Sequence, residues 1–381
     1  MHALRIACLC LIALLGAPSL ADDAKPRKPN PLFADAEILE VRIAAPFSTI
    51  MRERPVDEEM PGQLSYQDAE LGEVVLDVGI RTRGKYRQQM KICPFAPLRL
   101  NFKKEQTKKT LFTRTNKVKL VTHCRDRSER YSQGVLREFL AYRILNMLTE
   151  ESFQVRLLRA TYVDTSGKEA DRVDFAFMIE HDDRLAKRLD MKVSDAPETT
   201  IAALNRAHTN LGSVYQYLIG NTDFSPILAA PGEACCHNYV LLNPDDDKQR
   251  LNPDDDKQRL NPDDDEQRLN PDDDEQRPQL AVAYDFDMSG IVHARHAKPN
   301  PRFNLRDVRE RLYRGRCANN EYLESSLQTF RDQRQAINQL VTGSPHMSKG
   351  TKKTVQNYID IFYKTINNPR AVNARLIKKC L

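Results

Sequence analysis

The segment Gln279-Leu280-Ala281-Val282-Ala283-Tyr284-Asp285-Phe286-Asp287 joins an apolar run to two carboxylates. Upstream of it, His237-Asn238-Tyr239-Val240-Leu241-Leu242 is a second short apolar run. Both have the length and residue types of strands, and the Asn-Pro-Asp-Asp-Asp sequence that follows the first run favours a turn. The two runs therefore predict a β-hairpin that ends at Asp285. Asp287 is expected on the same face, because alternate residues of an extended chain share a face.

A nine-residue repeat occupies the tip of this hairpin. Leu-Asn-Pro-Asp-Asp-Asp-Lys/Glu-Gln-Arg occurs four times, at 242–250, 251–259, 260–268 and 269–277. Proline and aspartate disfavour both helix and strand, so we expect a solvated, Asp-rich repeat loop over 242–277. The alternative is a weak calcium-binding tract, because clustered carboxylates suit hard cations.

The repeats also mask the charge of the rest of the chain. The four copies hold twelve Asp, two Glu, two Lys and four Arg, a net charge of −8, whereas the whole chain carries +5. The remainder therefore carries +13, which favours acidic partners or an anionic cell surface. Ordinary surface charge is the alternative, and no nucleic-acid partner is expected.

The first 21 residues have the features of a cleavable signal peptide. Arg5 precedes an uncharged apolar run from Ile6 to Leu15, and small residues end the segment at Ala21. The run is too short to span a bilayer as a helix. We therefore expect a periplasmic or secreted protein whose mature chain has no transmembrane segment. A short buried helix in a cytosolic protein is the alternative.

Cysteine usage agrees with export. The cysteines beyond the signal segment are Cys93, Cys124, Cys235, Cys236, Cys317 and Cys380. An even number in an oxidising compartment predicts disulfides, and six cysteines allow 15 pairings. We expect Cys93 to pair with Cys124, because they flank consecutive expected strands. Adjacent cysteines rarely pair with each other, so residues 235–236 are expected to be tied to Cys317 and Cys380.

The order of the remaining elements predicts an α+β protein. Residues 22–36 are rich in proline and polar residues, as in a flexible leader. Residues 37–180 should be strand-rich and carry one helix, Ser132–Leu148, whose apolar residues recur at helical spacing. Residues 181–381 should be mainly helical, with the hairpin among the helices. Strands are expected at 38–43, 74–81, 97–102, 117–122, 153–162 and 173–180, and later helices at 200–219, 305–341 and 351–366.

Several polar residues follow one another in an order that suits phosphoryl transfer. That reaction needs carboxylates for magnesium, a cation on the phosphates and an acceptor for the substrate proton. Lys119 lies in an expected strand and Glu138 in the next helix, as a phosphate-binding lysine and its partner would. Asp223 follows a helix, as a catalytic aspartate would.

The hairpin would supply the metal ligands. Asn238 opens it and Asp285 closes it, with Asp287 two residues further on. Their amide and carboxylate oxygens are the ligands that magnesium and manganese prefer.

Four stretches resemble the CotH family of atypical secretory protein kinases. They are Ile80-Arg81-Thr82-Arg83-Gly84, residues 118–121, Leu136-Arg137-Glu138-Phe139-Leu140-Ala141-Tyr142-Arg143 and Tyr284-Asp285-Phe286-Asp287, within roughly residues 75–295. The resemblance implies an atypical protein-kinase-like fold, in which a strand-rich N-lobe carries one helix and a helical C-lobe contains the hairpin. It also implies ATP-dependent phosphorylation of exported proteins with Mg²⁺ or Mn²⁺. In that case Asp223 matches the catalytic-loop aspartate, Asn238 a metal-coordinating asparagine and Asp285 the metal-binding aspartate.

The sequence departs from that pattern in three ways. It has no G-x-G-x-x-G phosphate loop, and Asp223 and Asn238 are 15 residues apart, which requires an insertion between them. Lys103 is a rival for Lys119 as the phosphate-binding lysine. The structural alternatives are a surface ion pair for Lys119 with Glu138, and turn residues for Asp223 and Asn238.

Three functions follow from these observations. The first is an exported phosphotransferase that uses ATP and Mg²⁺ or Mn²⁺ on a protein substrate of the cell envelope or exterior. The second is a non-catalytic, pseudokinase-like binding protein of the envelope or exterior, favoured by the missing phosphate loop. The third is a calcium-dependent structural protein whose Asp-rich repeats are the working part. The oligomeric state and the acceptor are left open.

Overall fold

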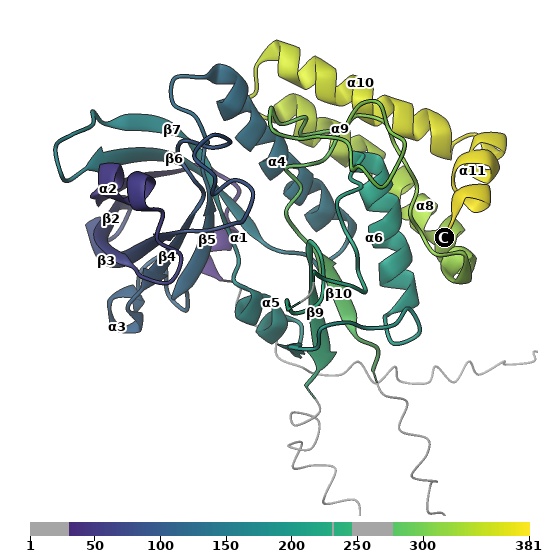
Figure 1. Ribbon diagram of the computed structural model, residues 1–381, viewed down its shortest axis with the longest axis horizontal. Coiled ribbons are helices and arrows are strands. Elements are labelled where there is room, and N and C mark those ends of the chain that lie inside the picture. The colour runs from purple at the N-terminus through teal and green to yellow at the C-terminus, as the bar shows by residue number, and fades with distance from the viewer. Residues whose placement is uncertain (1–29, 231, 246–276) are drawn as a thin grey trace, which may run out of the picture.

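Seven strands in the N-terminal half close into a barrel. The computed structural model describes residues 30–230, 232–245 and 277–381. Around the barrel the strands follow the order β1-β2-β3-β4-β5-β7-β6 (Figure 1). They are β1 (Leu39–Ala45), β2 (Met60–Asp68), β3 (Gly72–Thr82), β4 (Leu98–Phe102), β5 (Lys117–Val121), β6 (Val155–Asp164) and β7 (Arg172–Ile179). Each neighbouring pair is antiparallel except β1 with β6, whose parallel pairing closes the barrel.

Alternation of apolar and polar residues decides which way each strand faces. In β4, Leu98, Leu100 and Phe102 are buried in the barrel, whereas Arg99 and Asn101 are only partly buried. Side chains on successive strand residues point to opposite faces, so these two polar residues lie on the outside. The interior is filled by one hydrophobic cluster drawn entirely from residues 32–178.

The expected kinase-like, two-lobed fold is wrong. The described chain forms a closed seven-stranded β-barrel with mixed α/β content in place of a strand-rich N-lobe and a helical C-lobe. All six strands expected between residues 37 and 180 are present, but β2 was not expected, because only Leu64 and Tyr66 of its nine residues are buried. Closure depends on β1 pairing with β6, more than 100 residues away, and periodicity carries no information on such a partner.

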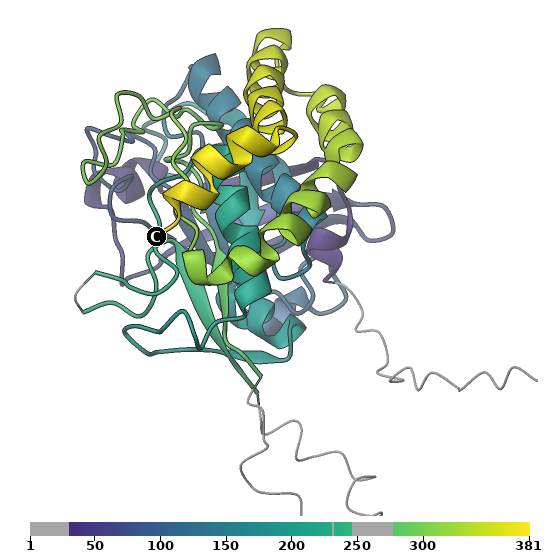
Figure 2. The ribbon, with the colours of Figure 1, turned by 90° about the vertical axis from the view of Figure 1, so that its right-hand side faces the viewer.

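Helices cover one side of the barrel. Residues of α4 (Glu129–Leu148) share a second hydrophobic cluster with the outward residues of β5, β6 and β7. Figure 1 shows α4 between the barrel and the C-terminal helices, and Figure 2 shows the same helices from the side. The other helices that complete this layer are α6 (Arg206–Ile219), α8 (Leu323–Asp332), α9 (Arg334–Gly343), α10 (Lys349–Ile366) and α11 (Pro369–Arg375). Shorter helices are α1 (Pro31–Ala34), α2 (Phe47–Glu53), α3 (Lys104–Thr107) and α5 (Asp182–Arg188).

The expected β-hairpin is confirmed. Strands β9 (Tyr239–Pro244) and β10 (Leu280–Ala283) pair antiparallel, with Leu242 opposite Leu280, and β8 (Met191–Val193) adds a third strand. The four β10 residues are buried, and β10 contacts α6. Most of the expected repeat loop at 242–277 lies outside the described residues, as do the expected signal peptide and the leader up to residue 29.

Three cysteine pairs lie at disulfide distance in the described part of the chain. Cys93 pairs with Cys124, as expected. The expectation for the others is wrong: Cys235 pairs with its neighbour Cys236, and Cys317 pairs with Cys380. The C-terminus explains the last pair, because Leu381 exchanges backbone hydrogen bonds with residues 315 and 317 and so brings Cys380 beside Cys317.

Within residues 30–230, 232–245 and 277–381, no helix has both the length and the apolar content needed to cross a bilayer.

Candidate functional site

A cleft of about 530 Å³ lies where the β3–β4 loop, β5, the hairpin and the loop after α6 meet. Clefts of this volume hold small-molecule ligands and cofactors. Its charged lining consists of Arg83, Lys85, Arg87, Lys119, Asp223, Glu233, His237, Asp285 and Asp287. Five of the six residues predicted from the sequence line this one cleft: Lys119, Asp223, Asn238, Asp285 and Asp287. The sixth, Glu138, is buried behind it and contacts the lining residue Arg87.

The Asp223 loop begins where α6 ends. Gly220 adopts a left-handed conformation with φ 65°, which ends the helix as glycine commonly does. Arg311 donates to the carbonyls of Tyr217 and Leu218, and Arg314 donates to those of Thr222 and Phe224. Arg311 satisfies carbonyl groups that the end of α6 leaves without intrahelical partners, and Arg314 satisfies carbonyl groups of the loop that follows. They therefore hold the backbone on both sides of Asp223.

The helix expected from residue 305 onward begins later. Residues 303–316 have no helical structure, and the next regular element is the 3₁₀ helix η2 (Cys317–Tyr322). The basic segment from Arg306 to Arg316 is therefore not helical. Two of its arginines, Arg311 and Arg314, are partly buried because they donate hydrogen bonds to backbone carbonyls of the protein.

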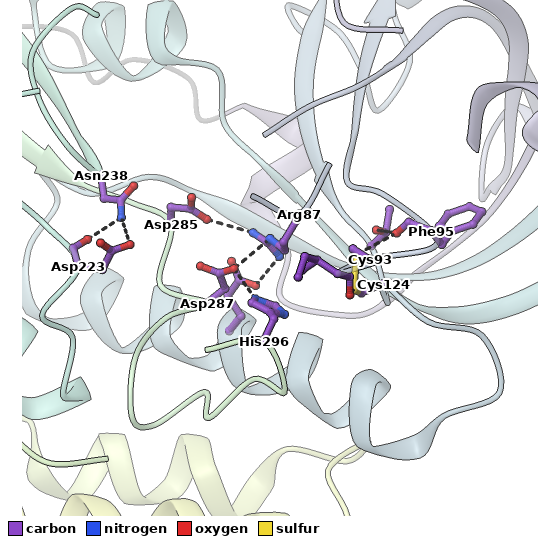
Figure 3. A network of polar contacts seen from close by, with 12 residues as sticks. Arg87, Cys93, Phe95, Cys124, Asp223, Asn238, Asp285, Asp287 and His296 are labelled. Atoms are coloured by element: carbon purple, nitrogen blue, oxygen red, sulfur yellow. Dashed lines mark hydrogen bonds and ion pairs between the residues drawn. A yellow bond between two sulfur atoms is a disulfide. The ribbon is translucent and has the colours of Figure 1, made fainter. Parts of the chain in front are cut away.

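Asp223 is held by two side chains of the hairpin. The Nδ2 group of Asn238 donates to the backbone carbonyl of Asp223 at 2.6 Å and to its carboxylate Oδ2 at 3.3 Å (Figure 3). His237 Nε2 lies 2.9 Å from the other carboxylate oxygen. The hydrogen bond and the charge of Asp223 raise the pKa of His237. The 15-residue spacing between Asp223 and Asn238 thus still brings their side chains into contact.

Asp285 projects into the cleft from an unusual backbone conformation. Its φ is 60°, and its backbone N–H donates to the Tyr142 hydroxyl at 2.8 Å. Left-handed conformations are uncommon outside glycine, and aspartate and asparagine tolerate them best. Asn238, whose backbone carbonyl accepts a hydrogen bond from the N–H of the adjacent Tyr284, has a similar φ of 57°. The two hairpin residues that were predicted to hold a metal both adopt this conformation.

Arg87 joins three carboxylates at the inner wall of the cleft. Its guanidinium lies 3.0 Å from Asp285 and 3.0 Å from Asp287 (Figure 3). It also lies 3.2 Å from Glu138. His296 Nε2 contacts Asp287 at 2.7 Å. The Arg87 side chain is only 9% exposed, so its charge depends on these carboxylates for stabilisation.

Burial decides the charge states in this cluster. Burial raises the pKa of Glu138 to about 8. Arg87 lowers this pKa, but the negative charges of Asp287 and Asp285 oppose its effect. Burial and Asp287 likewise raise the pKa of Asp285. Burial alone would raise the pKa of Asp287, but Arg87 and His296 lower it to about 2. Burial disfavours the charge of Arg87, yet its three carboxylates raise its pKa overall. Glu138 therefore binds a proton more readily than an exposed glutamate does, whereas Asp287 stays ionised at neutral pH.

The expected ion pair between Lys119 and Glu138 does not form. Lys119 Nζ contacts Asp182 at 2.6 Å and lies 4.6 Å from the centre of the Tyr284 ring, while Glu138 pairs with Arg87. Burial lowers the pKa of Lys119 in spite of Asp182. The rival Lys103 is exposed at the start of α3 and is not part of the cleft lining.

The cleft offers oxygen ligands for a divalent cation on its outer side. Asp223, Asn238 and Asp285 carry the carboxylate and amide oxygens that Mg²⁺ and Mn²⁺ prefer. Among the described residues, no group of three or more His, Cys, Asp and Glu side chains is arranged to hold a metal ion. Arg87 takes up oxygens of Asp285 and Asp287, so the inner side of the cleft already holds a cation. The donor chemistry therefore fits a metal bound by Asp223, Asn238 and Asp285, with Asp287 committed to Arg87.

Two residues of the cleft were missed at the sequence level. His237 was not among the predicted site residues, although it directly precedes Asn238. Arg87 was not considered, yet Arg81, Arg83, Lys85 and Arg87 place a cation at every second position from the end of β3 onward. That alternation was the available signal, because alternate residues of an extended chain share a face. Neither protein-family models nor curated proteins match this chain in sequence comparisons.

Proposed function

We propose that this chain is a phosphotransferase that binds ATP together with Mg²⁺ or Mn²⁺ in the cleft and phosphorylates a protein. The observation that supports the proposal is the division of the cleft into a basic and an acidic wall. Arg83 and Lys119 lie on the barrel side, and Asp223, Asn238 and Asp285 lie on the hairpin side. Cations that receive phosphates and carboxylates that bind a metal are the parts that phosphoryl transfer needs.

Each residue has a role in this proposal. Lys119 and Arg83 bind phosphate oxygens, as point and forked cations do. Asn238 and Asp285, with an oxygen of Asp223, hold the metal ion, which would neutralise charge on the transferred phosphoryl group. Asp223 orients the acceptor hydroxyl, and its contacts with Asn238 and His237 keep its carboxylate in place. Arg87 and Glu138 position Asp285 and Asp287 from behind.

Nucleotide binding to the purified protein tests the proposal. Thermal shift and calorimetry with ATP would be carried out with Mg²⁺, with Mn²⁺ and with EDTA. We expect stabilisation that needs the metal and is lost in Asp285→Asn, which keeps a residue tolerant of the left-handed backbone. Asp57→Asn, at an exposed position, is the matched control. Binding that is equal in Asp285→Asn and wild type would refute the proposal.

Transfer is measured separately from binding. With labelled ATP and envelope proteins as acceptors, Asp223→Asn keeps one side-chain oxygen for the metal and should still bind nucleotide. It should transfer phosphate ~10²–10⁴-fold more slowly at saturating ATP, because its amide cannot accept the proton of the acceptor hydroxyl. Equal transfer by Asp223→Asn and wild type would remove Asp223 from the mechanism.

The contacts of Arg87 favour a second candidate, a binding protein without catalytic turnover. An arginine that already neutralises Asp285 and Asp287 leaves less carboxylate charge for metal ions. Anion binding that needs no metal, with no transfer to any acceptor, would support this candidate over the first.

Export completes the proposal. The three cysteine pairs at disulfide distance are typical of proteins from oxidising compartments. We place the protein in the periplasm or outside the cell, with an acceptor of the envelope or exterior. Fractionation of cells that express the full chain, followed by N-terminal sequencing, would test this location. Recovery of the uncleaved chain in the cytoplasm would refute it.

A further inference from the structure

Three cations lie side by side across adjacent barrel strands. Arg81 of β3 is directly opposite Arg99 of β4, and Arg99 is directly opposite Lys119 of β5. Like charges in directly opposite positions destabilise a sheet. Three cations in adjacent, directly opposite positions therefore do not stabilise the barrel, which points to a role in binding.

All three side chains leave the barrel on its outer face. The residues that flank them in each strand, such as Ile80, Leu100 and Leu120, are fully buried in the barrel core. Because successive strand residues alternate between faces, the row projects outward. Its inner end is Lys119, which lines the cleft, and Arg83 lines the same cleft two residues beyond Arg81.

The neighbouring carboxylates do not balance the row. Lys119 pairs with Asp182, and the guanidinium of Arg81 donates to the backbone carbonyl of Val56. Burial and the nearby Arg81 and Arg83 lower the pKa of Arg99 against the attraction of Asp182 and Glu59. Arg99 itself contacts the ring of His181. Four cations, including Arg83, thus face two carboxylates that are near enough to affect Arg99.

We infer that Arg81, Arg99 and Lys119, together with Arg83, form a binding site for a condensed phosphate chain. Adjacent strands are ~4.8 Å apart, so the row presents three cations over ~10 Å, more than one phosphate group can contact. An extended acidic peptide carries same-face carboxylates only every ~6.6 Å, which is a poorer match. Arginine and lysine are the side chains that most often bind phosphate oxygens.

This inference deepens the proposed function and rests on it for the direction of the ligand. The row leads from the outer surface of the barrel to Lys119, and so toward Asp223 and Asp285 in the cleft. A condensed phosphate can come from a nucleoside triphosphate or from inorganic polyphosphate. Both have the same chain of charged phosphates, which is the feature that the row would recognise.

Arg99→Gln is the deciding variant, and Arg42→Gln is its matched control. Arg42 is an exposed arginine of β1, on the same barrel. Binding of tripolyphosphate and of ATP would be measured by calorimetry on the full chain, in EDTA and in Mg²⁺. Because a hydrogen bond to a charged group contributes ~1.5–3 kcal/mol, Arg99→Gln should bind tripolyphosphate ~10–100-fold more weakly, and Arg42→Gln should bind it as the wild type does.

The melting temperature without ligand separates binding from a structural role. Removing Arg99 relieves like-charge repulsion, so the unliganded Arg99→Gln protein should melt at or above the wild-type temperature. A lower melting temperature with unchanged tripolyphosphate binding would show that Arg99 is a structural partner of His181 and would overturn the inference. Binding of poly-glutamate but not of tripolyphosphate would overturn it in favour of an acidic peptide.

The two proposals can fail independently. If Mg²⁺-ATP binding depends on Asp285 but not on Arg99, the proposed function survives and the phosphate row is refuted. If tripolyphosphate binds through Arg99 while ATP shows no metal-dependent binding, the row survives and the proposed function fails. A matching loss for ATP and tripolyphosphate in Arg99→Gln supports the row. ATP that then binds more tightly than tripolyphosphate to the wild type identifies the nucleotide as the source.

Discussion

Arg87 and Asp285 are 198 positions apart in the chain, yet the guanidinium of one lies 3.0 Å from the carboxylate of the other. This contact ties the loop after β3 to the residue that ends the hairpin. The same guanidinium reaches Glu138 of α4, so the barrel, the helical layer and the hairpin meet at a single buried cation. The cleft is built around this junction.

Arg87→Met should strongly destabilise the protein. It would leave the buried Glu138 and Asp287 and the partly exposed Asp285 without their shared cation, and removal of one partner of a buried ion pair costs ~3–5 kcal/mol. Arg87→Lys keeps a charge but loses the fork geometry, so its loss should be smaller. Urea unfolding at pH 7 measures both, with Arg42→Met as an exposed control expected within ~0.5 kcal/mol of the wild type. A loss below ~1 kcal/mol in Arg87→Met would contradict this account.

Asn238 should tolerate glycine better than alanine. Its φ of 57° is accessible to glycine without strain, whereas a Cβ in the left-handed region costs ~1–2 kcal/mol. Both substitutions lose the two hydrogen bonds to Asp223 equally. We therefore expect Asn238→Gly to be more stable than Asn238→Ala by ~1 kcal/mol in chemical unfolding. The difference is smaller than the full strain of alanine, because glycine gives the unfolded chain more conformational freedom. An alanine variant as stable as the glycine variant would argue against the left-handed backbone.

Glu138 should make stability fall as the pH rises. Its pKa is about 8 in the folded protein against 4.5 in the unfolded chain, so between these values the folded state binds more protons. Stability then decreases with increasing pH across that window. In Glu138→Gln this contribution is absent, and the free energy of unfolding from pH 5 to 8 should be flatter than in the wild type. Identical slopes for the two proteins would show that Glu138 is ionised throughout.

Removal of the Cys317–Cys380 link should lower stability by several kcal/mol. The two cysteines are 63 positions apart, and a cross-link that closes a loop of this length stabilises by ~4 kcal/mol in the chain-entropy description. The double variant Cys317→Ser/Cys380→Ser, unfolded by urea under oxidising conditions, measures the effect. Wild-type protein treated with reductant is the comparison, and a double variant as stable as the oxidised wild type would show that the link is not formed.

Local chemistry in the sequence was sufficient for most elements and for the candidate residues. Short apolar runs predicted the hairpin, and strand-like stretches predicted six barrel strands, because residue type and pattern within a strand do not depend on its partner. Lys119, Asp223, Asn238 and Asp285 were chosen by residue type and order alone, and all four line one cleft. The pairing of Cys93 with Cys124 followed from two neighbouring strands.

Long-range pairing decided the rest. The parallel pairing of β1 with β6 closes the strands into a barrel. The residue pattern of neither strand predicts which strand it pairs with. The same holds for Arg87, whose three carboxylates come from distant segments, and for Lys119, which pairs with Asp182 instead of Glu138. The sequence by itself determined which segments form strands and helices and which side chains could do chemistry, because those properties depend on near neighbours. Only the tertiary structure decided how the strands close and which charges meet, because burial and ion pairing depend on residues that the fold brings together.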